Sequence, residues 1–416
     1  MNNSLSRSLA GVAIAAAAVL TTGCGSSDSG DSGGSGGSTG TSGSSAPGTL
    51  RASLTDAPSC GYDAVYVTVS KLRVHQSATA TDTDGGWSDI VLSPPRRVDL
   101  LGLSNGVLFE LGQTALPSGR YQQLRLVLVD NATTALANAV VPTGGSETPL
   151  DTPSGQQSGI KLQANVDVPA GQTVDVVLDF DACRSVVSRG NSGRYNLKPV
   201  IAVIPMISVG SISGYAAAPA PAPAERVKVS AQVNGTVIKE TTIASGAQFV
   251  LSPIAAGTYD VVFTAAGRST RVVTAVPVFT AGNTVMNTLA SPITVPSSPV
   301  GTVGGRVTPA AAQAGVRALQ SIAASRRVEV GTVTADGLTG DYALVLPTAP
   351  VEVASPIWPS PPIATPPVYV FSAVAGSGGS YTLEASAVGY GTITSSMLVV
   401  PPGGSVTQNF TLIATP

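Results

Sequence analysis

The sequence feature that most constrains the fold is a two-residue alternation of apolar and polar side chains. In residues 173–181 (TVDVVLDFD) the apolar side chains at positions 174, 176, 178 and 180 share one face and three Asp lie on the other, and residues 63–75 and 121–129 show a similar alternation. Successive side chains of a strand point to opposite faces, so such runs predict half-buried strands, and the Gly, Pro and Asp clusters between them predict turns. We therefore expect an all-β chain of tandem antiparallel β-sandwich domains, Ig-like or transthyretin-like, after a disordered N-terminal tether.

Composition supports this expectation and excludes several classes of protein. The 416 residues include 46 Gly and 31 Pro, and only 11% of the residues are charged. A coiled coil or helical bundle would instead be rich in Glu, Lys, Leu and Arg. The formal net charge is −2, so the sequence predicts no cationic surface for nucleic acid.

The N-terminal residues predict export and anchoring. Residues 1–23 have the pattern of a signal peptide, and their apolar run (residues 9–20) is too short to span a membrane. The segment LTTGC, which ends at Cys24, resembles the lipobox of bacterial lipoproteins. That resemblance implies that Cys24 is acylated, with palmitate among the attached chains. The alternative is an ordinary secretory signal with an incidental cysteine.

Residues 24–48 are then the lipidated cysteine and a disordered Gly/Ser tether, because they contain almost nothing to bury. The residue after Cys24 is Gly rather than an Asp retention signal, which favours the outer membrane. Whether the protein faces the periplasm or the cell surface is left open.

Cysteine use fits an oxidising compartment. With Cys24 acylated, Cys60 and Cys183 remain as a pair, and we expect a disulfide between them. The alternative is two buried free thiols.

Residues 49–209 contain several short motifs in a fixed order: residues 54–58 (LTDAP), 64–69 (AVYVTV), 119–121 (GRY), 179–182 (DFDA) and 195–200 (YNLKPV). With these motifs the region resembles the family catalogued as domain of unknown function 4382, which is common in bacterial lipoproteins. The resemblance implies a cell-envelope β domain and names no activity.

Two further sandwiches are expected, over residues 210–291 and 300–416. Residues 246–251 (GAQFVL) and 257–261 (GTYDV), and then residues 341–347 (DYALVLP), resemble carboxypeptidase regulatory-like, transthyretin-type modules. The last region carries a Pro-rich insertion, residues 347–367, which we interpret as an extended surface loop.

Few residues point to chemistry. His75 is the only histidine, which excludes metal sites built on several imidazoles. On the strand at residues 173–181, Asp175, Asp179 and Asp181 share one face, and Asp56 could complete a site there for a hard cation such as calcium. The alternative is structural: ion pairs with Arg125 and Lys198, and a turn capped by Asp56.

From these observations we expect no enzyme, no cofactor and no confident metal site. The predicted function is a cell-envelope lipoprotein with a structural or ligand-binding role. Its predicted partners are the membrane, through the lipid, and an envelope protein or glycan. The alternatives are a catalytic or accessory component of polysaccharide processing, and a surface adhesin.

Overall fold

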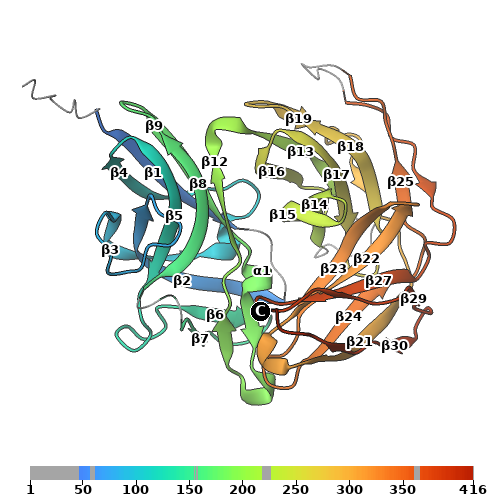
Figure 1. Ribbon diagram of the computed structural model, residues 1–416. Coiled ribbons are helices and arrows are strands. Elements are labelled where there is room, and N and C mark those ends of the chain that lie inside the picture. Colours follow the sequence, from blue (N-terminus) through green and yellow to red (C-terminus); the bar gives the residue numbers. More distant parts are fainter. Residues whose placement is uncertain are drawn as a thin grey trace, which may run out of the picture. The chain divides into compact units, whose positions relative to one another are not determined.

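The computed structural model describes residues 46–56, 61–153, 155, 158–217, 226–359 and 366–415. The predicted signal peptide, Cys24, the tether up to residue 45 and Cys60 lie outside the described residues. Nearly all regular structure is β, as expected, and most strand pairs are antiparallel (Figure 1). Residues 45–416 form one compact unit.

The first region is built from two sheets, and a single core lies between them. The four-stranded sheet has the order β12 (Ile201–Pro205), β9 (Thr173–Phe180), β1 (Gly48–Asp56), β4 (Phe109–Leu116). The eight-stranded sheet has the order β10 (Val186–Ser188), β11 (Tyr195–Leu197), β7 (Thr148–Asp151), β6 (Ala139–Pro142), β2 (Tyr62–His75), β5 (Gly119–Leu128), β8 (Ile160–Val168), with β3 (Ser88–Asp99) also paired to β2.

In β9, apolar and acidic side chains lie on opposite faces, as the sequence predicts. Val176, Leu178 and Phe180 are buried in the core, whereas Asp175 and Asp179 lie on the opposite face. The acidic face of β9 therefore points away from this core and can contact other parts of the chain.

The second region has a sheet of order β16 (Gln248–Ala255), β13 (Val209–Ala217), β19 (Asn283–Val285), with β20 (Ile293–Thr294) also on β13. The facing sheet has the order β15 (Thr236–Ala244), β14 (Arg226–Val233), β17 (Gly257–Thr264), β18 (Arg271–Val278), β25 (Glu352–Ala354), β26 (Ser372–Ala373).

The third region repeats this plan with β24 (Asp341–Pro347), β21 (Val300–Thr308), β30 (Ser405–Thr407) and, on β21, β31 (Phe410–Thr411). Its second sheet is β23 (Arg326–Thr334), β22 (Gly315–Ala323), β27 (Ser380–Ser386), β28 (Ile393–Thr394), with β29 (Leu398–Val399) on β27. The short helices are α1 (Ala182–Ser185), η1 (Leu100–Leu103), η2 (Gly190–Ser192), η3 (Met206–Ser208) and η4 (Ala310–Ala312).

All three regions share one local arrangement. In each, the opening strand (β1, β13 or β21) is antiparallel to one neighbour and parallel to a late strand (β9, β19 or β30). A backbone N–H of the opening strand donates to a carbonyl just before the late strand in every case: Thr49 to Gln172 at 2.8 Å, Ser211 to Gly282 at 2.9 Å, Thr302 to Gly404 at 2.9 Å. The three regions therefore share this arrangement around the opening strand.

The Pro-rich insertion is not a free loop, contrary to our expectation. Within it, β25 pairs in parallel with β18 of the second region. Farther along, Trp358, Tyr369 and Phe371 pack partly buried against the core of the second region. The insertion thus extends the second region's sheet beyond β18, whose edge would otherwise expose unpaired backbone groups.

Among the described residues no helix combines the length and the apolar character that crossing a bilayer would require.

Candidate functional site

The acidic face of β9 leads to the most unusual feature of the molecule. Asp179 Oδ1 lies 2.6 Å from Lys239 Nζ on β15, and these side chains are 11% and 2% exposed. Asp181 caps α1, because its Oδ1 accepts a hydrogen bond from the Arg184 backbone N–H at 2.9 Å. Asp175, at the other end of the strand, makes an exposed pair with Arg51.

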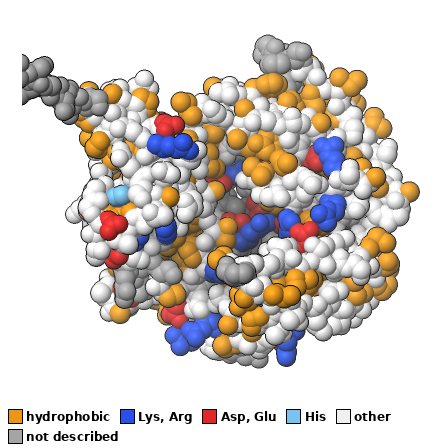
Figure 2. All heavy atoms as spheres, in the orientation of Figure 1, with side chains coloured by type: hydrophobic (Ala, Val, Ile, Leu, Met, Phe, Trp, Pro, Cys, Tyr) orange, Lys and Arg blue, Asp and Glu red, His pale blue; other side chains and the backbone are white. Residues whose placement is uncertain are grey.

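These contacts belong to a larger group in which all three regions take part. We call it the junction cluster, and its members are Asp179, Asp181 and Arg184 from the first region, Lys228, Lys239 and Glu240 from the second, and Arg317, Arg327, Glu329 and Glu384 from the third. Figure 2 shows acidic and basic side chains gathered near the middle of the face in view, while most of that face is uncharged.

Glu329 on β23 links the cluster. Its Oε1 lies 2.6 Å from Arg184 Nη2 and its Oε2 lies 3.6 Å from Arg317 Nη1, although the Glu329 side chain is only 1% exposed. Its backbone also exchanges hydrogen bonds with the Gln232 amide of β14, at 2.7 and 2.9 Å. One residue of the third region therefore contacts both of the others.

Burial determines the electrostatics of the cluster. It raises the pKa of Asp181 to about 6, with a further contribution from the nearby charge of Glu240. Burial also raises the pKa of Asp179 and of Glu329, against the opposing effects of Lys239 and Arg184. Charges taken out of water in this way are costly unless they are paired, so each partner depends on the others.

Arg125 and Lys198 do not pair with these acids, which corrects our expectation. Arg125 is on β5 of the facing sheet, where its guanidinium donates to the Ala80 carbonyl at 2.7 Å and packs 5.1 Å from the Trp87 ring centroid. Lys198 donates to two carbonyls of the third region. The expectation assumed that the acids face strands of their own domain, whereas they face the second region.

Among the described residues, Asp56 is not grouped with Asp179 and Asp181 at the distances that metal ligands need. Its side chain is buried, and Oδ1 accepts a hydrogen bond from Ala182 N at 2.9 Å, which fixes the start of α1. In the part of the chain that the structure describes, the group of three potential ligands that come within 4.8 Å of one another is Asp181, Cys183 and Glu240. That group already has basic neighbours, and we assign no metal to it.

Cys183 is half-buried in α1. Its expected disulfide partner, Cys60, lies outside the described residues, so the pairing stays a prediction.

Sequence reasoning missed Lys239, Glu240, Glu329 and Glu384. A signal was present: in a chain with so few charges, residues 239–240 (KE) and 326–329 (RRVE) place charges within strands. Those charges need partners, but the identity of the partners depends on how the regions pack.

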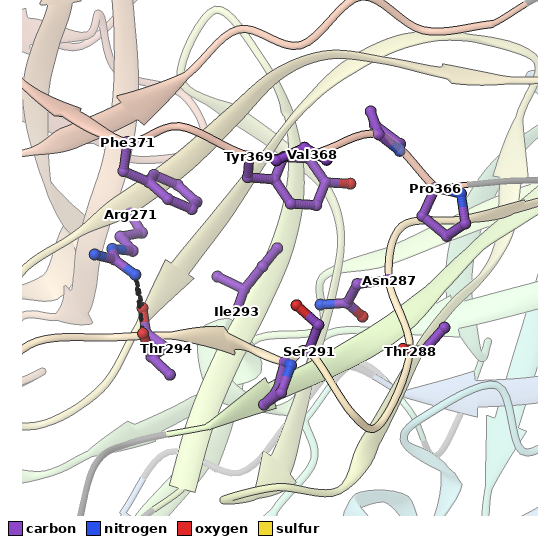
Figure 3. A pocket seen from close by; sticks show the side chains of 12 residues that line it. Arg271, Asn287, Thr288, Ser291, Ile293, Thr294, Pro366, Val368, Tyr369 and Phe371 are labelled. Carbon is purple, nitrogen blue, oxygen red and sulfur yellow. Dashed lines mark hydrogen bonds between the residues drawn. The ribbon is translucent and has the colours of Figure 1, made fainter.

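Two hollows are also candidate binding sites. One, of about 400 Å³, lies beside the insertion in the second region, where Tyr369 and Phe371 face Ile293 and Ser291 across it (Figure 3). Its Arg271 is already engaged, with Glu352 at 2.6 Å and the Thr294 carbonyl at 2.6 Å. The other hollow, of about 340 Å³, adjoins the junction cluster and is lined by Arg184, Lys198 and Arg317 among others.

No curated protein sequence matches this chain. Three of the solved structures that match have TM-scores below 0.2. A type II cohesin–X-dockerin complex from Acetivibrio cellulolyticus is 28% identical over 22% of this chain, with a TM-score of 0.19, and the match spans 59% of that structure's chain. The Bacillus anthracis TIE protein is 12% identical over 88% of this chain and 58% of its own, with a TM-score of 0.17. The major pilin subunit of Bacillus cereus is 9% identical over 89% of this chain and 100% of its own, with a TM-score of 0.15.

One family model matches the N-terminal part of the described chain. The matched residues contain β1 to β11 and the acidic face of β9, with Asp179, Asp181 and Arg184 of the junction cluster. Residues 47–199 match the family described as Domain of unknown function (DUF4382), which supports that family for the first region.

Proposed function

We propose that this protein is a lipid-anchored component of the bacterial cell envelope, and that its three sandwiches serve as one rigid, non-catalytic body. The lipid would be on Cys24, and residues 25–48 would be the tether. The outer membrane is the proposed location, and a disulfide between Cys60 and Cys183 would add a crosslink in that oxidising compartment. The two C-terminal sandwiches would be modules of the carboxypeptidase regulatory-like type.

The observation that carries the structural role is the junction cluster. Flexible domain arrays join their domains by exposed linkers and small interfaces. Here, instead, Glu329 and Lys239 are buried against charges of other regions. If the regions separated, these charges would lose their partners, so the arrangement favours one body over three independently moving domains.

The insertion supports the same role. Because β25 belongs by sequence to the third region but pairs with β18 of the second, these two regions also share a sheet. A body joined in two ways is suited to act as a spacer or as a platform for a partner.

The anchor is tested by metabolic labelling with a palmitate analogue. We expect the wild type to be labelled and to stay in the membrane fraction, and Cys24→Ser to lose both properties. The matched control is Cys60→Ser, which should keep the label. An unlabelled wild type, or equal labelling of Cys24→Ser, would mean that the protein is exported without this anchor.

A further inference from the structure

The hollow beside the junction cluster has an unbalanced charge. Its described lining includes three basic residues and no acidic one, in a cavity of about 340 Å³. The volume is at the lower end of the range for small-molecule sites, roughly 300–1,000 Å³. The rest of the lining is aliphatic or uncharged: Val200, Gln313, Gly315, Thr332, Thr334, Ser386, Ala387 and Val388.

Of the three basic residues, Lys198 is the best placed to bind a ligand. Its Nζ donates to the carbonyls of Ala312 and Gln313, each at 2.9 Å. An ammonium has three N–H donors, so these two contacts leave one donor unused. Burial lowers the pKa of Lys198, and no carboxylate of the described residues is paired with it.

The two arginines add to the positive charge on this side of the cluster. Arg184 and Arg317 are paired with Glu329 and Glu384, but those carboxylates do not line the hollow. A molecule in the hollow would therefore contact Arg184 and Arg317 and not their carboxylate partners. Such a surface attracts anions, and the nearby Val200, Ala387 and Val388 offer an apolar group a place to pack.

We propose that this hollow binds a small organic anion, a carboxylate attached to an apolar group. The carboxylate would accept the remaining N–H of Lys198, and the apolar group would lie against Val200, Ala387 and Val388. Charge-assisted hydrogen bonds of this kind are stronger than neutral ones, and apolar contact with Val200, Ala387 and Val388 favours an anion that carries an apolar group over an inorganic anion.

Ligand binding at this site would favour the state in which the first and third regions are in contact. Lys198 belongs to the first region, and its carbonyl partners and Val388 belong to the third. A ligand that binds only when the two regions are together stabilises the folded, joined state in proportion to its occupancy. The inference goes beyond the proposed spacer role and does not depend on the lipid anchor.

The test uses the full-length chain and three probes: benzoate, its neutral analogue benzyl alcohol, and inorganic sulfate. We expect saturable binding of benzoate in titration calorimetry, with a Kd of about 1 mM or below, and at least about tenfold weaker binding of both other probes. Lys198→Met should weaken benzoate binding about tenfold. The matched control is Lys161→Met, which removes an exposed lysine on β8 and should leave the Kd unchanged.

A second variant is independent of the hydrogen bonds that Lys198 makes. Val388 is 87% exposed, so Val388→Asp should fold normally and weaken benzoate binding by placing a negative charge at the hollow. Absence of saturation by benzoate, equal binding of sulfate or benzyl alcohol, or an unchanged Kd in either Lys198→Met or Val388→Asp would overturn the proposal.

Discussion

Arg184, in the short helix that follows β9, forms an ion pair with Glu329 on β23, and 2.6 Å separates Arg184 Nη2 from Glu329 Oε1. The two residues are 145 positions apart in the sequence. Around this pair, buried carboxylates and partly exposed cations from all three sandwiches neutralise one another. In a chain with only 11% charged residues, this concentration of buried charge marks the place where the regions are held together.

Replacing Glu329 by Gln should destabilise the protein strongly. The change removes the carboxylate that Arg184 and Arg317 share. Because Arg184 keeps Asp181 and Arg317 keeps Glu384, we expect a loss of about 1.5–3 kcal/mol, the usual size for a hydrogen bond to a charged group. Urea unfolding followed by circular dichroism would measure the loss. The control is Asp341→Asn, which breaks the exposed Arg306 pair and should change nothing measurable. Equal effects of the two variants would refute the buried role of Glu329.

Stability should depend on pH through Asp181. Its pKa is about 6 in the folded protein, above the value of about 3.9 for an unfolded aspartate. The folded state therefore holds this proton more tightly. The contribution to stability is fully present below about pH 4 and is lost as the pH rises through about 6.

The measurement for Asp181 is the free energy of unfolding of the wild type and of Asp181→Asn between pH 4 and 8. Relative to the wild type, the variant should gain stability as the pH rises through this window. Asp175→Asn, which alters the exposed pair with Arg51, serves as the control and should show no such trend. A difference between Asp181→Asn and the wild type that is constant with pH would contradict the prediction.

Gly305 should not tolerate a side chain. On β21, a Cβ at this position would overlap the backbone carbonyl of Gln408, which cannot move without disturbing the sheet. Gly305→Ala should cost about 3 kcal/mol or more. Gly315→Ala, on β22, is the matched control because a Cβ there meets nothing within 4 Å. Thermal melts would compare the two variants. Similar melting temperatures would show that the close contact between Gly305 and the Gln408 carbonyl does not limit the side chain at this position.

Much of the fold could be predicted from local pattern. The alternation in β9 fixes which face is buried, so Leu178 and Phe180 are in the core as expected. The motif at residues 257–261 likewise leads to a buried Tyr259 on β17. Such features depend on the periodicity of a strand, which is visible within about ten residues.

The partners of the acidic face could not be predicted in this way. Asp179 pairs with Lys239 across 60 positions of sequence, and nothing local to either strand indicates that β9 and β15 meet. The same holds for β25, a three-residue strand in a Pro-rich segment, whose pairing is decided by the exposed edge of β18. Both depend on the packing of whole regions.

The disulfide between Cys60 and Cys183 should be detectable by non-reducing peptide mapping. The bond would close a loop of more than a hundred residues, for which the chain-entropy model gives up to about 4–5 kcal/mol. We expect reductant to lower the melting temperature of the wild type and to leave Cys183→Ser unaffected. Recovery of both cysteines as alkylated thiols, without reductant, would exclude the crosslink.

The most direct test of the single rigid body is differential scanning calorimetry of the intact chain. If the junction cluster joins the three sandwiches, they should unfold in one transition whose calorimetric and van't Hoff enthalpies agree. Two or three separate transitions in the wild type, unchanged in Glu329→Gln, would mean that the sandwiches unfold independently, and the account would be wrong.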